Sequence, residues 1–142
     1  MRAPGLALLL ALLAAPAAAV LPEPPGDPET AEAVRLLEGG REAMSLPLLQ
    51  AVLARNPEDP DVLVYIALAQ RRLGRPELAM DAYLRALAAS PNHPAALAYQ
   101  GSLYLEMGDR WRAEANYLQL TFSCGTCAEA TTLARELAAA PR

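Results

Sequence analysis

The sequence predicts an all-α fold of stacked helix pairs, and three observations lead to that prediction. Residues 60–93 hold two amphipathic helical patterns, joined by a turn at Gly74 and closed by Pro91. The same pattern returns around residues 26 and 94, so the chain repeats with a spacing of 34 residues. Thirteen prolines punctuate the chain, and each suits a helix boundary because proline fixes φ and has no N–H.

Residues 1–19 have the pattern of a secretory signal peptide. Arg2 provides a positive start, residues 6–15 are an apolar run, and the alanines at 17–19 form a cleavage site. We therefore expect export to the bacterial periplasm or outside the cell, with cleavage after Ala19 and no stable membrane insertion afterwards. The alternative is an uncleaved membrane anchor, although the apolar stretch is short for a bilayer and Pro16 interrupts it. Residues 20–28 are rich in proline and predict an extended lead-in.

Three units without insertions follow, at residues 26–59, 60–93 and 94–127. Glycine recurs in register where a turn between two helices favours positive φ. Proline recurs after the second helix, which cannot continue through it. Small residues occupy the two positions where paired helices come close, and a large residue lies beside them. In unit order, these residues are Gly40, Gly74 and Gly108; Pro57 and Pro91; Ala33, Ala67 and Gly101; Ser45, Ala79 and Ala113; and Leu49, Tyr83 and Tyr117.

Two residues depart from the pattern. Pro47 falls inside the second helix of the first unit, where we expect it either to kink the helix or to delay its start to a cap at Ser45. Gly125 replaces the closing proline of the third unit. Residues 128–142 then form a short amphipathic helix and a tail, with one apolar stripe. That helix is expected to cover the apolar end of the third unit, as stacked repeats require. Its stripe consists of Ala130, Leu133, Ala134 and Leu137.

These recurring residues resemble the tetratricopeptide repeat over residues 26–127. The resemblance implies a right-handed solenoid of three helix pairs, here with a C-terminal capping helix. In layout the chain is also similar to small exported bacterial proteins of this family that end in a cysteine pair and a short helix. The family usually binds other proteins, so we expect a protein-protein interaction module: an adaptor, a scaffold or an assembly factor.

In the family, the first helices of successive units line a concave groove. The resemblance implies an apolar middle and a charged edge, and a partner that is an apolar or amphipathic protein segment. Arg71 and Arg72 would be available to an acidic group beside it, whereas Val64 and Leu68 replace the polar residues that grip a terminal carboxylate in some members. The alternative is that Val64 and Leu68 are packed under neighbouring helices and both arginines are solvated. The implied groove residues are Thr30, Val34, Leu37, Glu38, Val64, Leu68, Arg71, Arg72, Ala98, Ser102, Leu105 and Glu106.

Cys124 and Cys127 are the two cysteines of the chain. After an export signal, a structural disulfide is the first interpretation. Thiol–disulfide exchange or metal handling is the alternative, although a redox pair is expected between a strand and a helix. Ala128 stands where covalent haem needs a histidine. His93, the one histidine, is interpreted as a surface residue rather than a metal ligand, because zinc needs four ligands.

The remaining features indicate no enzyme and no cofactor. No nucleophile, base and acid fall in a catalytic pattern, and each glycine is accounted for by the repeat. Glu58, Asp59 and Asp61 are expected to cap a helix N-terminus rather than bind metal. The net charge of −4 and the lack of basic clusters disfavour nucleic acid. A structural subunit of a larger envelope complex stays open as a further alternative.

Overall fold

The structure is a computed structural model that describes residues 26–141. The predicted signal peptide, its cleavage site and most of the predicted lead-in lie outside these residues. All regular secondary structure in the described part is helical, which confirms the predicted fold class. The helices are α1 (Pro28–Glu38), α2 (Glu42–Arg55), α3 (Pro60–Arg72), α4 (Pro76–Ala89), α5 (Pro94–Glu106), α6 (Arg110–Cys124) and α7 (Ala128–Ala139).

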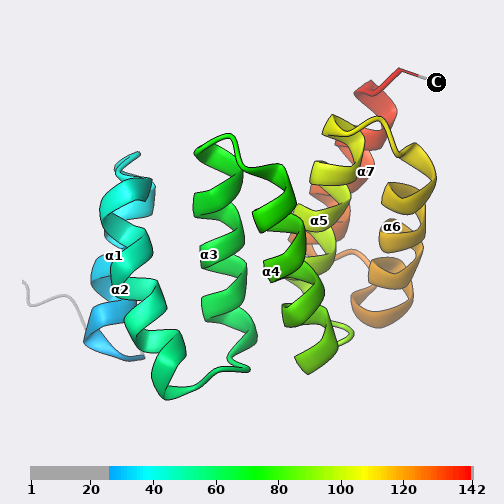
Figure 1. Cartoon of the computed structure of the whole chain (residues 1–142). Coiled ribbons are helices and arrows are strands. Elements are labelled where there is room, and N and C mark those ends of the chain that lie inside the picture. The colour runs from blue at the N-terminus through cyan, green and yellow to red at the C-terminus, as the bar shows by residue number, and fades with distance from the viewer. Residues whose placement is uncertain (1–25, 142) are drawn as a thin grey trace, which may run out of the picture.

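The helices stack along one direction, from α1 and α2 at one end to α5, α6 and α7 at the other (Figure 1). α1 packs against α2, α3 against α4, and α5 against α6. Each pair also contacts the next, through α2 with α3 and through α4 with α5. The first helices of the pairs are adjacent as well, since α3 contacts both α1 and α5. This adjacency creates the face on which the candidate site lies.

The helix boundaries follow from proline and glycine. α1, α3, α4 and α5 each have proline in the first turn, where the missing N–H would have had no partner within the helix. The turns inside the pairs depend on the predicted glycines: Gly40, Gly74 and Gly108 have φ of 69°, 74° and 79°. A side chain at these positions would strain the backbone.

Large and small residues alternate in the core, as predicted. Leu49 and Tyr83 are fully buried, and the small residues Ala33, Ala67, Ala79 and Ala113 around them have no exposed surface. Because alanine brings two helix backbones close together, one large side chain per pair fills the space that remains.

The expected start of α2 at a cap on Ser45 is wrong, whereas the expected kink at Pro47 stays a prediction. The helix begins at Glu42, before both residues, and Pro47 lies inside it on an exposed face. The carbonyl that proline leaves without a helical donor belongs to Ala43, which is also exposed and so meets water. Ser45 is buried, and its hydroxyl donates a hydrogen bond of 2.8 Å to the carbonyl of Ala33. It ties α2 to α1 instead of capping α2.

α7 covers the last helix pair, as the apolar stripe predicted. Ala130, Leu133 and Leu137 are buried, and α7 packs against both α5 and α6. The contact is close at Gly101 of α5, where a Cβ atom would lie 2.7 Å from Cδ2 of Leu133. Gly125, the departure from the repeat, ends α6 with φ of 68° and lets the chain turn into α7.

Candidate functional site

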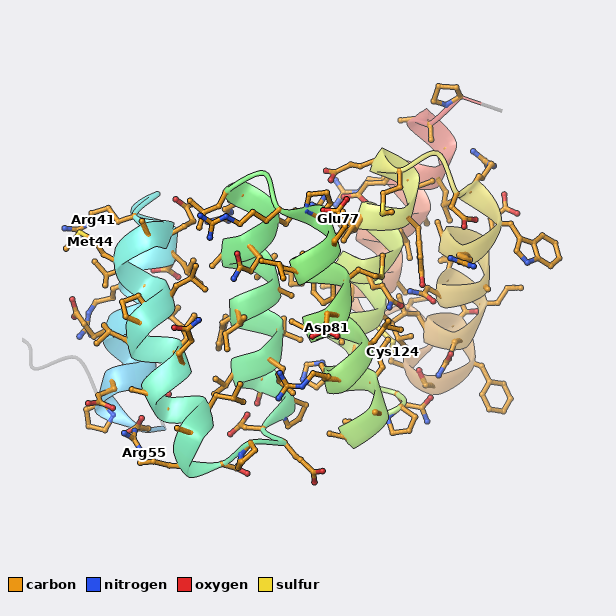
Figure 2. The ribbon with its side chains drawn as sticks, in the orientation of Figure 1. Arg41, Met44, Arg55, Glu77, Asp81 and Cys124 are labelled. Atoms are coloured by element: carbon orange, nitrogen blue, oxygen red, sulfur yellow. A yellow bond between two sulfur atoms is a disulfide. The ribbon has the colours of Figure 1, made fainter. Side chains whose placement is uncertain are left out.

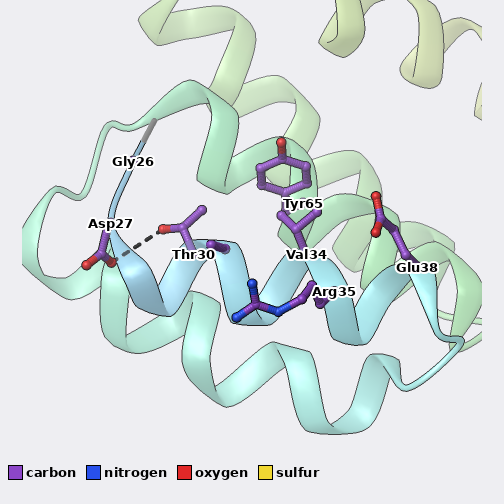
Figure 3. Close-up of a pocket in the computed structure, with 8 residues that line it drawn as sticks. Gly26, Asp27, Thr30, Val34, Arg35, Glu38 and Tyr65 are labelled. Atoms are coloured by element: carbon purple, nitrogen blue, oxygen red, sulfur yellow. Dashed lines mark hydrogen bonds between the residues drawn. The ribbon is translucent and has the colours of Figure 1, made fainter. Parts of the chain in front are cut away.

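The face formed by α1, α3 and α5 contains two hollows. The first, the α1–α3 hollow, measures about 260 Å³ and is lined by Gly26, Asp27, Thr30, Ala31, Val34, Arg35, Glu38 and Tyr65. In Figure 3 the ring of Tyr65, from α3, lies over Val34 of α1, with Glu38 at one end and Asp27 at the other. The hydroxyl of Thr30 is 3.4 Å from Oδ2 of Asp27. The hollow thus has an apolar middle and charged ends.

The second, the α3–α5 hollow, measures about 430 Å³ and lies between the next two first helices. It is lined by Leu68, Arg71, Arg72, Tyr99, Ser102, Glu106 and, from α7, Glu136. An adjoining depression adds Leu105 and the end of α7. Ser102 lies within hydrogen-bond distance of both the carbonyl of Ala98 and the carboxylate of Glu136. The capping helix therefore contributes a side chain to this face.

Three of the predicted groove residues are in the core instead. Leu37, Val64 and Ala98 have exposed fractions of 4% or less and line neither hollow. Leu68 is half-buried, packs against the core on one side and lines the α3–α5 hollow on the other. The alternative of packing under neighbouring helices thus describes Val64, whereas Leu68 still reaches the surface. Thr30, Val34, Glu38, Ser102, Leu105 and Glu106 all border these hollows.

The two arginines are paired within the chain. Arg71 donates to the carboxylate of Glu106, with Nε 3.0 Å from Oε2. Burial disfavours the charged form of Arg71, but its hydrogen bond and the charge of Glu106 outweigh burial and raise its pKa. Arg72 donates to the carbonyl of Leu37 at 2.7 Å, and Glu42 lies 3.5 Å from it. An acidic ligand would therefore compete with these partners for the guanidinium N–H groups.

Sequence reasoning missed Tyr65 and Tyr99, each of which lines one of the hollows. They are 34 residues apart, so they occupy the same place in successive units. Burial raises the pKa of Tyr65, and the charge of Asp61 adds to the shift, so its hydroxyl stays protonated at neutral pH. The sequence signal for these two residues was an aromatic side chain that recurs in successive units, at a position outside the contacts within a helix pair.

The cysteines lie at the junction of α6 and α7. Cys124 ends α6, Cys127 is the N-cap of α7, and their sulfur atoms are 2.12 Å apart, at disulfide distance. Both side chains are partly buried and pack against the core of the last helix pair. They line neither hollow of the α1–α3–α5 face.

The acidic cluster and His93 act as helix caps. Oδ1 of Asp59 accepts hydrogen bonds from the backbone N–H of Asp61 and of Val62, which confirms the capping expected at α3. His93 caps α5: its Nδ1 accepts from the N–H of Ala96 at 3.2 Å, and its Nε2 is 2.9 Å from Oδ1 of Asp61. With 14% of its side chain exposed, His93 is a capping residue and not the plain surface residue that was expected.

The described residues contain neither a cluster of metal-ligating side chains nor a helix suited to span a membrane. Within residues 26–141 no three histidine, cysteine or acidic side chains gather as a metal site would require. None of the helices in this part of the chain has the length and apolar character needed to cross a bilayer.

Comparison with known proteins gives one family and a consistent set of folds. Residues 30–94 match the model of the tetratricopeptide repeat. This stretch spans the first two predicted units, so the third unit and the predicted unit boundaries stay predictions. No curated protein matches the chain in sequence at a significant level.

Several solved structures have a similar fold. One is the type III secretion chaperone SycD of Yersinia enterocolitica, solved in complex with a peptide of the translocator YopD. It is 16% identical to this chain with a TM-score of 0.70, and the match covers 78% of this chain and 88% of SycD. The second tetratricopeptide domain of human RPAP3, bound to the HSP70 peptide SGPTIEEVD, has 14% identity and a TM-score of 0.68, over 78% and 92%.

A tetratricopeptide repeat protein from Parabacteroides merdae has 21% identity and a TM-score of 0.68, over 77% of this chain and 43% of that protein. At these identities the likeness concerns the fold. The family match shows tetratricopeptide repeats in residues 30–94, and the helix stack has the fold of tetratricopeptide repeat proteins.

Proposed function

We propose that this protein is an interaction module that binds a segment of another protein along the α1–α3–α5 face. Support comes from relatives in fold: SycD and the RPAP3 domains have been solved with peptides of other proteins. The observation that carries the proposal is the pair of hollows, each bordered by a tyrosine from the same place in successive units. Such a pair suits two side chains of one extended or helical segment.

The proposed segment is apolar or amphipathic and does not depend on an acidic end. The side chains of Val34, Leu68 and the two tyrosines offer the hollows apolar surface and aromatic faces. Arg71 and Arg72 are already paired with groups of the chain, and Glu106 and Glu136 add negative charge nearby. We therefore expect peptides such as SRMEEVD, which RPAP3 binds, to bind poorly, because their carboxylates would meet like charges.

Export and a structural disulfide belong to the same proposal. The signal pattern of residues 1–19 favours an exported protein, and an oxidising compartment favours a bond between Cys124 and Cys127. The pair joins the end of α6 to the start of α7 and packs against the core, which suits a structural bridge more than a redox centre. A reduction potential below about −300 mV would support a structural bridge, and a more positive value would favour thiol exchange. No enzymatic activity is proposed.

The test is a peptide-display selection on the full chain, followed by fluorescence polarisation with the selected peptides. We expect apolar or amphipathic peptides, and a weakening of binding by about tenfold in Tyr65→Ala or Tyr99→Ala, since aromatic anchors commonly contribute more than about 1 kcal/mol. Circular dichroism checks that each variant is folded.

Leu84→Ser is the matched control, because Leu84 is exposed on α4 and lines neither hollow. Its affinity should equal that of the parent chain. Selected peptides that bind the double variant Tyr65→Ala, Tyr99→Ala as tightly as the parent would rule out this face. Tight binding of SRMEEVD would contradict the charge argument alone.

A further inference from the structure

α6 carries an exposed apolar row on the side that faces away from the core. Trp111, Leu118 and Phe122 are 81%, 66% and 93% exposed, and Ala115, also exposed, lies between them. Their spacing of four, three and four residues places them in one line along the helix. Ala113 and Leu120, on the opposite side, are fully buried. We call the four exposed residues the α6 row.

The repeat itself does not require this row. The corresponding residues of α4 and α2, 34 and 68 positions earlier, are also exposed, yet Leu84 is the one large apolar side chain among them. Two of those in α4, Glu77 and Asp81, are acidic and lie one turn apart in Figure 2. Since the three helices have the same place in their pairs, the apolar character of α6 has another cause. The corresponding residues are Glu77, Asp81, Leu84 and Ala88 in α4, and Ala43, Pro47, Gln50 and Ala54 in α2.

We propose that a second copy of this chain covers the α6 row, with the two α6 helices antiparallel about a two-fold axis. The spacing of the row is that of a coiled-coil seam, in which one large or small side chain enters a gap on the facing helix. An axis between Ala115 and Leu118 puts the small residue opposite the large one. Trp111 then faces Phe122 of the partner subunit, so the row is complementary to itself.

Charge and area favour this occupant. The row is flanked by Arg112 and Gln119 on one side and by Glu114 and Thr121 on the other. In the antiparallel arrangement Arg112 faces Gln119 of the partner subunit, and Glu114 faces Thr121 of the partner subunit. No like charges therefore meet. Buried aromatic side chains contribute about 150–250 Å² each. Two copies of the row therefore bury on the order of 1,000 Å², which is the lower limit for a specific interface.

A membrane surface is the competing occupant, and the charge of the chain disfavours it. The net charge is −4, and anionic lipids bind to basic clusters. Arg110 and Arg112, the basic residues beside the row, are paired with Glu114 and Asp109 of the chain itself.

The single tryptophan of the sequence makes the test direct. Trp111 emission from the full chain is recorded over a dilution series, beside sedimentation equilibrium, with the protomer mass taken from the denatured protein. We expect a mass of two protomers at high concentration, and a red shift of the emission as dilution releases the row to water. A single-protomer mass with constant emission overturns the proposal. A shift that occurs only when phosphatidylcholine or phosphatidylglycerol vesicles are added overturns it in favour of a membrane.

Leu118→Glu and Leu84→Glu form a matched pair, because both residues are exposed at the same place of successive second helices. Leu118→Glu should raise the dissociation constant of the dimer at least about tenfold, and Leu84→Glu less than about twofold. Equal effects would overturn the assignment to α6. Phe122→Glu should also weaken the dimer, and adding Trp111→Lys should restore part of the affinity, since lysine then faces glutamate. If the second change weakens the dimer further, the helices are not antiparallel.

Discussion

The middle helix pair, α3 with α4, and the last pair, α5 with α6, have the same backbone plan but different neighbours. Both begin with proline and turn at a glycine with φ of 74° or 79°. Among their differences are Ala67 against Gly101 in the first helix, buried Tyr83 against half-buried Tyr117 in the second, and the partly acidic outer side of α4 against the α6 row. The repeated residues determine the helix pair, and the residues that differ adapt each pair to what lies beside it.

Gly101 illustrates this adaptation. The middle pair lies between two other pairs, whereas the last pair lies between the middle pair and the single helix α7. α7 brings Leu133 so close to α5 that a Cβ at Gly101 would force the Leu133 side chain to shift. Alanine at the matching position of α3 is fully buried without such a clash.

The largest expected effect breaks this contact. Leu133→Ala should lower the free energy of unfolding by about 2–4 kcal/mol through the cavity it leaves. Gly101→Ala should cost about 1–3 kcal/mol by overpacking. In the double variant the new methyl group occupies part of the cavity, so the combined cost should be smaller than the sum. Urea denaturation measures all three variants; strict additivity would mean that the two residues are not coupled.

The cysteine pair tests the other feature particular to the last pair. If the bond between Cys124 and Cys127 forms, Cys124→Ser with Cys127→Ser should cost about 2 kcal/mol, the chain-entropy value for so small a loop. Reducing agent should destabilise the parent chain by a similar amount and leave the double variant unchanged. If reducing agent leaves the urea midpoint of the parent chain unchanged, the bond between Cys124 and Cys127 does not form.

The two helix pairs also differ in the N-cap of their first helix, which is Asp59 in α3 and His93 in α5. Asp59→Ala removes two hydrogen bonds to the start of α3 and should cost about 1 kcal/mol. His93→Ala should cost a similar amount at α5, whereas His93→Asp should restore the stability of the parent, because aspartate is a preferred cap and favours the helix dipole. Thermal denaturation at neutral pH ranks the three variants. A His93→Asp protein no more stable than His93→Ala would show that the imidazole contributes through Asp61 instead.

The smallest effect at neutral pH is expected at Tyr83. Its hydroxyl is buried with no hydrogen-bond partner within residues 26–141, so Tyr83→Phe should change stability by less than about 1 kcal/mol. Tyr117→Phe, in the last pair, is the control.

Burial raises the pKa of Tyr83 far above its usual range, against the opposing charge of Arg71. The folded chain therefore keeps this proton where the unfolded chain loses it, and stability falls as pH rises above about 10. Tyr83→Phe should reduce that fall between about pH 9 and 11, as followed by circular dichroism. An unchanged alkaline decline would mean that another group causes it.

The fold was predictable because it depends on residues with narrow backbone preferences. Gly74 and Gly108 favour one kind of turn, Pro60 and Pro94 favour a helix start, and alanine marks close helix contacts. The stripe of α7 was equally clear, since its period left one buried side. The delayed start of α2 at Ser45 was wrong because the helix includes Pro47; the cost of an internal proline depends on whether the carbonyl left without a donor reaches water, which a single sequence does not reveal.

The face of the site was less predictable than the fold. Register alone placed Val64 and Ala98 on the inner side of the helices, yet the crossing of neighbouring helices buries them. Glu136 joins the face because α7 folds back onto α5, a contact that follows from tertiary packing. The recurrence of Tyr65 and Tyr99 in register is visible in the sequence. That their position borders a hollow became clear only from the structure.

Arg71 and Arg72 are neighbours on α3 but reach in opposite directions along the stack. Arg71 is bonded to Glu106 of α5, and Arg72 to the carbonyl of Leu37 at the end of α1. One end of α3 is thereby tied to both adjacent first helices, which fixes their spacing before any ligand arrives. A ligand that binds across these helices would find its site already shaped and would lose little entropy in ordering it. The two arginines would then contribute to affinity through preorganisation, in addition to any contact they make as lining residues of the α3–α5 hollow.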